Sequence, residues 1–344
     1  EKDMFENGSI RIKTKPFCTV QALDVSIPKG RMIAVTGVSG SGKTSLAIEC
    51  LVPALQAVIQ GTKLPEHVDS IEAKGIQSVK VIDSKPIGAN VRSTVATYDG
   101  VFDDLRKLFA RTADAKAKGL TAGDFSYNTG KLRCPVCDGT GIITMDVQFL
   151  PDVDTICPSC GGSRYGKDAY DILWKSKEKD SVSVSLPGLL KLTVEEAAGI
   201  LHEETKIAKQ LKILQDFGVC YLTLGEATPA LSGGEAQRLK LAYEMETPQQ
   251  GSVFVFDEPT IGLHPQDVKK LVLIFDHLIQ LGATVIVIEH DLELVTNCDY
   301  IIDMGPWGGT EGGRVVVEGT PEAVAATSES ITGRYLKQEL AEDK

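Results

Sequence analysis

No stretch of this sequence is apolar over the roughly 18–20 residues that a membrane-spanning helix needs, and no signal peptide is visible. We therefore expect no membrane partner. Basic residues are in the minority, with 36 Lys and Arg against 47 Asp and Glu, a formal charge of −11. This balance argues against a surface that is basic all over, but it is compatible with a local basic patch. The 344 residues can form two or three domains, and because they begin with Glu1 they are compatible with a fragment of a longer protein.

A phosphate-binding loop lies near the N-terminus. Residues 37–44 match G-x-x-x-x-G-K-[ST] between a predicted strand at 31–36 and a predicted helix from residue 45 onward. Such a loop directs backbone N–H groups and the positive end of a helix at one point. We expect Lys43 to reach the β- and γ-phosphates of ATP and the Thr44 hydroxyl to bind Mg²⁺. The predicted ATP-binding residues are Gly37, Ser39, Gly40, Ser41, Gly42, Lys43, Thr44 and Ser45.

Two later predicted strands end in residues suited to hydrolysis. The strand at 252–257 delivers Asp257 to the magnesium ion, and Glu258 is then placed to act as the general base. The strand at 284–289 precedes His290, which could bind the γ-phosphate. Parallel strands present functional residues at their carboxyl ends, so we predict that Glu258 and His290 are catalytic. Ordinary strand-end residues are the alternative, and Phe17 is either an adenine-stacking ring or a core residue.

A serine-glycine-glycine segment opens a predicted helix before Asp257. Ser232 can cap this helix, and the glycines leave backbone N–H groups open to a phosphate. The arrangement resembles the signature loop of ABC ATPases, which completes the nucleotide site of a partner module. The resemblance implies that two modules sandwich ATP and that one module alone is nearly inactive. The residues expected to act in trans are Ser232, Gly233, Gly234 and Glu235.

Four of the eight cysteines have the spacing of a zinc site. They form two C-x-x-C pairs, each followed by glycines that suit knuckle turns, at Cys134, Cys137, Cys157 and Cys160. Four thiolates leave no coordination position for water, so the predicted Zn²⁺ is structural. Reduced free cysteines and a redox pair are the alternatives. A P-loop enzyme is expected in the reducing cytoplasm, which argues against disulfide bonds.

The predicted fold is an α/β ABC-type P-loop ATPase with a large, mostly helical insertion that carries the signature region and a four-cysteine zinc module. We predict a discontinuous ATP-binding domain at 1–84 and 228–344, an insertion at 85–227, and a zinc module at about 130–166. Within the insertion, an amphipathic helix is predicted at 101–110, a connector at 113–123 and a helical segment at 193–218. Residues 85–177 hold 13 basic and 11 acidic residues, so the insertion is the expected contact region for a polyanion.

Taken together, these motifs resemble the UvrA family of bacterial nucleotide excision repair ATPases, specifically its C-terminal half. The turn formed by Gly262, Leu263 and His264 adds to the resemblance, since transporter ATPases usually carry a different turn there and have no zinc module. The family implies a second ABC module, from another copy or another half, and double-stranded DNA as a partner. It also implies a UvrB-type repair partner that docks on an N-terminal half outside this sequence.

The sequence departs from the family pattern at three places. Ser84 stands where the family has a Gln that contacts Mg²⁺ and water, so hydrolysis is expected to be slow or differently coupled. The segments at 89–92 and 142–146 lack basic residues usual in the family, and phosphate contacts supply much of DNA affinity. We therefore weigh two main functions: an ATP-dependent sensor of distorted or damaged duplex DNA in nucleotide excision repair, and a UvrA-like paralogue with weak DNA binding that serves drug self-resistance. A transporter-type ATP-binding subunit is a third alternative, against which the zinc module and the turn at 262–264 argue.

Overall fold

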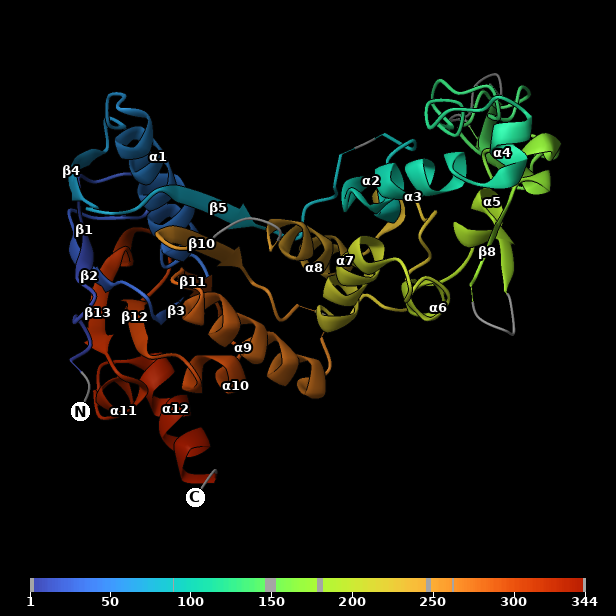
Figure 1. The fold of residues 1–344 in the computed structure, drawn as a ribbon. Helices are drawn as coiled ribbons and strands as arrows, with labels where there is room; N and C mark the ends of the chain where they lie inside the picture. The colour runs from blue at the N-terminus through green and yellow to red at the C-terminus, as the bar shows by residue number, and fades with distance from the viewer. Residues whose placement is uncertain are drawn as a thin grey trace. The chain divides into compact units, whose positions relative to one another are not determined.

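The computed structural model describes residues 3–88, 90–145, 153–177, 182–245, 249–261 and 263–342, and the chain divides into two compact units (Figure 1). The first unit comprises Glu1–Ser84 and Met245–Lys344, and the second comprises Lys85–Glu244. We predicted that the ATP-binding domain resumes at residue 228, whereas the second unit continues to Glu244. It keeps the signature helix because Lys240 donates to the carbonyl of Lys85 at 2.8 Å and the ring of Tyr243 lies 5.4 Å from that of Tyr98.

The first unit alternates strands and helices around one sheet. Its elements are β1 (Ser9–Thr14), β2 (Asp24–Pro28), β3 (Met32–Gly37), η1 (Ser45–Leu51), α1 (Val52–Gln60), β4 (Val68–Glu72), β5 (Ser78–Ile82), β10 (Ser252–Asp257), α9 (Pro265–Gln280), β11 (Thr284–Ile288), α10 (Leu292–Thr296), β12 (Tyr300–Gly305), η4 (Gly309–Glu311), β13 (Arg314–Gly319), α11 (Pro321–Ala325) and α12 (Ile331–Glu342).

The main sheet has six strands in the order β13-β12-β3-β11-β10-β5. The strands from β12 to β5 pair in parallel, and β13 is antiparallel to β12. In this register Val255 lies opposite Ile286, which in turn lies opposite Ile33. Because parallel strands end at the same edge, the segments that follow β3, β10 and β11 meet at the carboxyl edge of the sheet.

Both faces of the sheet are covered, which explains why its central strands are mostly apolar and are buried along almost their whole length. On one face, η1, α1 and a small antiparallel sheet (β2-β1-β4) contribute to one apolar core with the strands, which includes Ile12, Leu55 and Val255. On the other face, the ring of Phe256 lies 4.5 Å from the ring of Phe275 in α9, which runs beside β11 (Figure 1). The strand ends are therefore anchored by a buried core.

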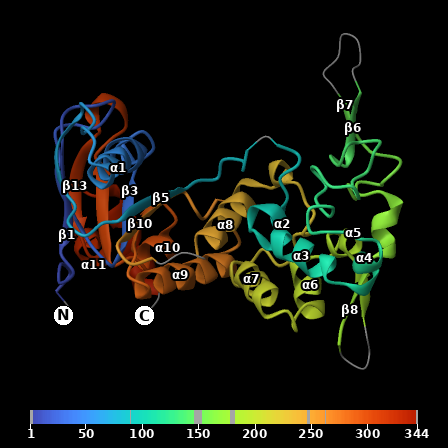
Figure 2. The same ribbon diagram turned by 45° about the horizontal axis from the view of Figure 1, so that its top comes forward.

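The second unit is mostly helical, as predicted, with two short hairpins. Figure 2 shows the hairpin of β6 and β7 projecting from the helices of this unit. Its elements are α2 (Val95–Tyr98), α3 (Val101–Ala110), α4 (Ala113–Ala117), β6 (Ile142–Met145), β7 (Val153–Ile156), η2 (Lys167–Asp171), β8 (Leu173–Lys175), β9 (Ser183–Ser185), α5 (Leu186–Leu189), α6 (Val194–Ile200), α7 (Thr205–Asp216), η3 (Thr228–Ala230) and α8 (Gly233–Glu244).

Sequence patterns within the second unit predict some helices better than others. The helix α3 has its predicted bounds and buries Phe102, Leu105 and Phe109. The predicted capping box at Thr193 is present, but the segment 193–218 forms two helices, α6 and α7, because the turn at 201–204 interrupts it. The predicted connector contains the short helix α4, whose N-terminus is capped by Thr112. Throughout the described part of the chain, every helix is too short or too polar to span a membrane.

Candidate nucleotide site and zinc centre

The phosphate-binding loop joins β3 to η1 through backbone conformations that favour glycine. Gly37, Gly40 and Gly42 have φ values of 128°, 74° and 99°. At Gly37 a side chain would also collide with the sheet, because an added Cβ would lie 2.0 Å from the carbonyl oxygen of Met304. The loop can therefore fold tightly against the end of β12 only with glycine at this position.

A second glycine-rich segment, residues 308–313, braces this loop. The N–H of Gly309 donates to the carbonyl of Gly40 at 3.1 Å, and the N–H of Gly313 donates to that of Ser41 at 3.0 Å. An added Cβ at Gly308 would lie 2.6 Å from the carbonyl oxygen of Ser39. Our prediction from sequence did not include this segment in the site, although its run of glycines was an available signal.

Lys43 folds back over its own loop. Its Nζ donates to the carbonyl oxygens of Gly37 at 2.8 Å and Val38 at 3.0 Å. Burial lowers the pKa of Lys43, while the charges of Glu258, Asp303 and Asp257 act in the opposite direction. The ammonium group of Lys43 therefore interacts electrostatically with Asp257, at the end of β10, and with Glu258, which follows it.

The predicted catalytic carboxylate lies in a turn directly after β10. Asp257 pairs with Ile288 in the sheet, and the N–H of Glu258 donates to the carbonyl of Ile288 at 3.0 Å. Glu258 has a φ of 47°, an unusual value for a residue with a side chain, and such backbone conformations cost about 1–3 kcal/mol. His290 follows β11 at the same sheet edge, and its side chain is 67% exposed. The sheet therefore brings Lys43, Asp257, Glu258 and His290 to one edge.

The predicted signature residues lie in the second unit, where Ser232 is exposed at the start of α8. Its N–H donates to Glu235 Oε2 at 2.7 Å, and the N–H of Glu235 donates to Ser232 Oγ at 3.4 Å. The hydroxyl of Tyr221 donates to Glu235 Oε1 at 2.8 Å and accepts from Arg238 at 3.2 Å. This tyrosine was missed from sequence, because nothing in its local pattern predicts the contact.

The four predicted zinc ligands converge. Their sulfur atoms all lie within 4.8 Å of one another, with Cys134 and Cys157 at 4.0 Å and Cys137 and Cys160 at 3.7 Å. A tetrahedral site with Zn–S bonds of about 2.3 Å has S–S edges of about 3.8 Å, so the cluster fits a zinc ion. The N–H of Gly141 donates to the Cys137 sulfur at 3.3 Å, as expected of a knuckle turn.

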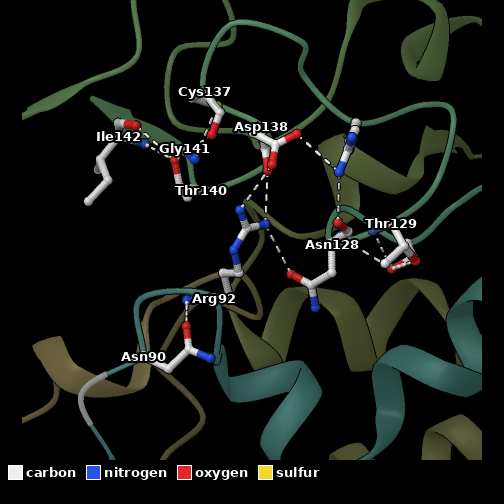
Figure 3. A network of polar contacts seen from close by, with 11 residues as sticks. Asn90, Arg92, Asn128, Thr129, Cys137, Asp138, Thr140, Gly141 and Ile142 are labelled. Atoms are coloured by element: carbon white, nitrogen blue, oxygen red, sulfur yellow. Dashed lines mark hydrogen bonds and ion pairs between the residues drawn. The ribbon is translucent and has the colours of Figure 1, made fainter. Parts of the chain in front are cut away.

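One aspartate beside this centre, Asp138, contacts two arginines, and Figure 3 shows its contacts with Arg92. Arg92 donates to the carbonyl of Asp138 at 2.8 Å and forms an ion pair with its carboxylate at 3.4 Å. Arg133 forms an ion pair with the other oxygen of the same carboxylate at 3.0 Å. Arg92 Nη1 also lies 3.4 Å from Oδ1 of Asn128. Asp138 thus offsets part of the positive charge on this face of the zinc module.

Phe17, a candidate adenine-stacking residue, stacks on His67 with ring centroids 3.9 Å apart. Gly262 of the family-specific turn lies outside the described residues, as do Ala89 and Asp146 of the two segments poor in basic residues.

The fold and the residues at the sheet edge define the first unit as an ABC-type P-loop ATPase domain, as predicted. The chain is 44% identical over 94% of its length to UvrABC system protein A of Staphylococcus aureus (strain COL). It is 42% identical over 98% of its length to the same protein of Lactiplantibacillus plantarum. The chain is thus a relative of UvrA, as its motifs predict, and it spans about a third of the length of these curated relatives, at 34% and 35%.

A solved structure agrees with this relationship. The crystal structure of UvrA2 from Deinococcus radiodurans superimposes with a TM-score of 0.88 at 40% sequence identity. The match covers 96% of this chain and 39% of that one. No protein-family model matches the chain.

Proposed function

We propose that this chain is an ATP-hydrolysing module of the UvrA type that couples ATP binding to contact with distorted or damaged duplex DNA in nucleotide excision repair. The observation that carries the proposal is the coexistence, in one chain, of Lys43 with Asp257 and Glu258 at a sheet edge and of four clustered thiolates in the second unit. The relationship to UvrABC system protein A supports it.

In this proposal, the phosphate-binding loop and Lys43 bind the phosphates of ATP. Thr44 and Asp257 would hold Mg²⁺, which when bound would supply positive charge at the phosphate oxygens. Glu258 accepts a proton from the attacking water as the water adds to the γ-phosphorus and ADP leaves. His290 hydrogen-bonds the γ-phosphate, so the site distinguishes ATP from ADP.

Hydrolysis further requires a second ABC module. Ser232, Gly233, Gly234 and Glu235 bind the γ-phosphate held by the partner module, and the exposure of Ser232 is compatible with that role. Two modules then close on ATP and separate after hydrolysis. The partner is a second copy of this chain or another half of a longer protein, and a UvrB-type protein would dock outside this sequence.

The second unit contacts the duplex. Cys134, Cys137, Cys157 and Cys160 would hold a structural Zn²⁺ and so order the turn with Asp138, which Arg92 and Arg133 contact. A protein that reads DNA shape rather than base sequence needs mainly backbone contacts, which arginines supply.

A second candidate function is that of a UvrA-like paralogue with weak DNA binding, used in drug self-resistance. One observation favours it: Asp138 engages both Arg92 and Arg133, so the positive charge available for phosphates is reduced.

A titration separates the two functions. The zinc-loaded chain would be titrated with ATP into intact and lesion-bearing duplexes at two salt concentrations. Preference for the lesion, with an affinity that falls steeply with salt, supports a repair function. Equal and feeble binding to both duplexes contradicts it and favours the paralogue.

A further inference from the structure

Glu289 is a buried carboxylate at the nucleotide site to which no role has been given above. It follows β11 directly, its N–H donates to the carbonyl of Val35 at 3.2 Å, and its side chain is fully buried. A buried carboxylate is costly unless its oxygens accept hydrogen bonds. Its partners therefore indicate what the residue does.

The carboxylate joins the turn after β10 to the turn after β11. Oε1 accepts from both the N–H and the hydroxyl of Thr260, the former at 2.9 Å. Oε2 accepts from the N–H of His290 at 2.8 Å and that of Asp291 at 3.1 Å. The first turn begins with Glu258, and the second carries His290.

Among the described residues, the groups that hydrogen-bond to this carboxylate are three backbone N–H groups and the Thr260 hydroxyl, and all four act as donors. A carboxylate has an acceptor oxygen on both sides and can therefore bind all of these donors, whereas a side-chain amide has an oxygen on one side only. In a Glu289→Gln variant the amide oxygen would face His290 and Asp291, whose backbone N–H groups cannot turn into acceptors. The NH₂ group would then face the N–H of Thr260, two donors against each other.

We propose that Glu289 is a positioning residue that fixes the turn carrying Glu258 relative to the turn carrying His290. It acts on the reaction through Thr260 and the backbone of the two turns, and its Oε2 also lies 3.9 Å from Nδ1 of His290. Because Glu258 has a left-handed backbone conformation, its turn needs external support, and the Thr260 contacts supply it. The inference rests on the proposed ATPase function.

The test compares the full zinc-loaded chain with Glu289→Gln. The matched control is Glu293→Gln, which makes the same change four residues further on, at a carboxylate that pairs only with exposed Lys269 among the described residues. A second variant, Thr260→Val, removes the hydroxyl donor and leaves the N–H. For each protein, kcat and KM for ATP, the Kd of a non-hydrolysable ATP analogue, the melting temperature and amide hydrogen exchange of residues 258–261 and 290–291 are measured.

The expected result is a loss of kcat by about tenfold or more in Glu289→Gln, with KM and Kd changed by no more than about threefold. Amide hydrogen exchange should accelerate more at residues 258–261 than at 290–291, because the side-chain NH₂ group of the variant would face the N–H of Thr260. Thr260→Val should show a smaller loss of kcat, and Glu293→Gln should behave as the unchanged chain does. If Glu289→Gln does not fold, loss of kcat with retained ATP binding in Thr260→Val supports the inference, and unchanged kcat there overturns it.

Two outcomes overturn the inference while leaving the proposed function intact. One is an unchanged kcat in Glu289→Gln, and the other is a parallel fall of kcat, ATP affinity and melting temperature, which would mark a general structural role. Absence of turnover in the unchanged chain would count against pairing of the chain with itself or against the proposed function, but not against the inference. The exchange measurement would then decide the inference, because unchanged exchange at 258–261 in Glu289→Gln overturns it and accelerated exchange supports it.

Discussion

The two units hold their functional residues by different means. In the first, Lys43, Glu258 and His290 follow strands of a sheet whose two faces are buried, so the hydrophobic core fixes them. In the second, the sulfur atoms of Cys134, Cys137, Cys157 and Cys160 are clustered, and Ile143 is a partly buried residue packed against them. The geometry of the nucleotide site thus depends on packing and backbone conformation, whereas the geometry of the cysteine cluster depends on four sulfur atoms that lie close together.

Removal of the zinc ion should have the largest effect, and it should unfold part of the second unit while leaving the first unit folded. We expect about one zinc per chain, and loss of it in Cys137→Ser with unfolding of residues 130–165, since structural zinc contributes about 10–16 kcal/mol in zinc-finger peptides. ATP binding should change by no more than about twofold if the first unit is stabilised by its own core. Metal analysis, circular dichroism and ATP titration measure these effects.

The control for this prediction is Cys220→Ser, which changes an isolated cysteine of the same unit. It should leave the metal content unchanged. A folded, metal-free preparation of the unchanged chain would refute the zinc assignment.

Glu258→Gln should have the next largest effect, confined to the first unit. Loss of a general base typically costs a factor of about 10²–10⁴ in turnover, and the amide should leave ATP binding intact. Steady-state kinetics and binding of ATP measure the two quantities, with the exposed Glu322→Gln as the control. Undiminished hydrolysis in Glu258→Gln would count against this residue as the base.

The main sheet was predictable because its central strands are continuous apolar runs. The predicted strand at 252–257 is β10 without change, and the predicted strand at 284–289 ends one residue later than β11. The strand β12 was not predicted as such, although it carries Asp303, which is buried and accepts hydrogen bonds from Thr36 and Ser330. The partners of Asp303 lie far from it in the sequence, so no local sequence pattern predicts these hydrogen bonds.

The site residues were predictable to the extent that they lie in contiguous motifs. The loop, the β10 carboxylates and the cysteine pairs each have a spacing that follows from the chemistry of phosphate or zinc binding. The bracing segment 308–313, the contact of Tyr221 with Glu235, and the carboxylate of Glu289 depend on tertiary neighbours. Motif reasoning therefore finds the groups expected to contact ligands and misses those that hold them in place.

A substitution of glycine sharpens the claim that backbone geometry fixes the first site. Gly37→Ala should weaken ATP binding by at least about tenfold, equivalent to about 1.4 kcal/mol, because its Cβ would overlap the carbonyl of Met304. Gly199→Ala is the matched control, since no atom outside its own helix lies within 4 Å of the added Cβ and alanine favours the helix α6. ATP affinity as strong in Gly37→Ala as in the control would contradict the close-packing argument.

Asp138→Asn should have the smallest effect and tests the charge of the second unit. Loss of the carboxylate charge leaves the charges of Arg92 and Arg133 without this compensation, so duplex affinity at low salt should rise by about two- to fivefold, with a steeper dependence on salt. Fluorescence anisotropy with a labelled duplex measures both quantities. Asp168→Asn, at an exposed residue of η2, is the control. Equal affinities in the two variants would show that Asp138 does not limit contact with DNA.

The central claim is that ATP is hydrolysed at a site made by two modules, and a mixing experiment tests it most directly. Lys43→Ala removes the phosphate contact and Ser232→Arg blocks the signature, so each variant alone should be inactive when the chain pairs with itself. An equal mixture forms mixed pairs with one complete site and should regain about a quarter of the original activity. Full activity of Ser232→Arg alone, or a mixture as inactive as its components, would contradict the account.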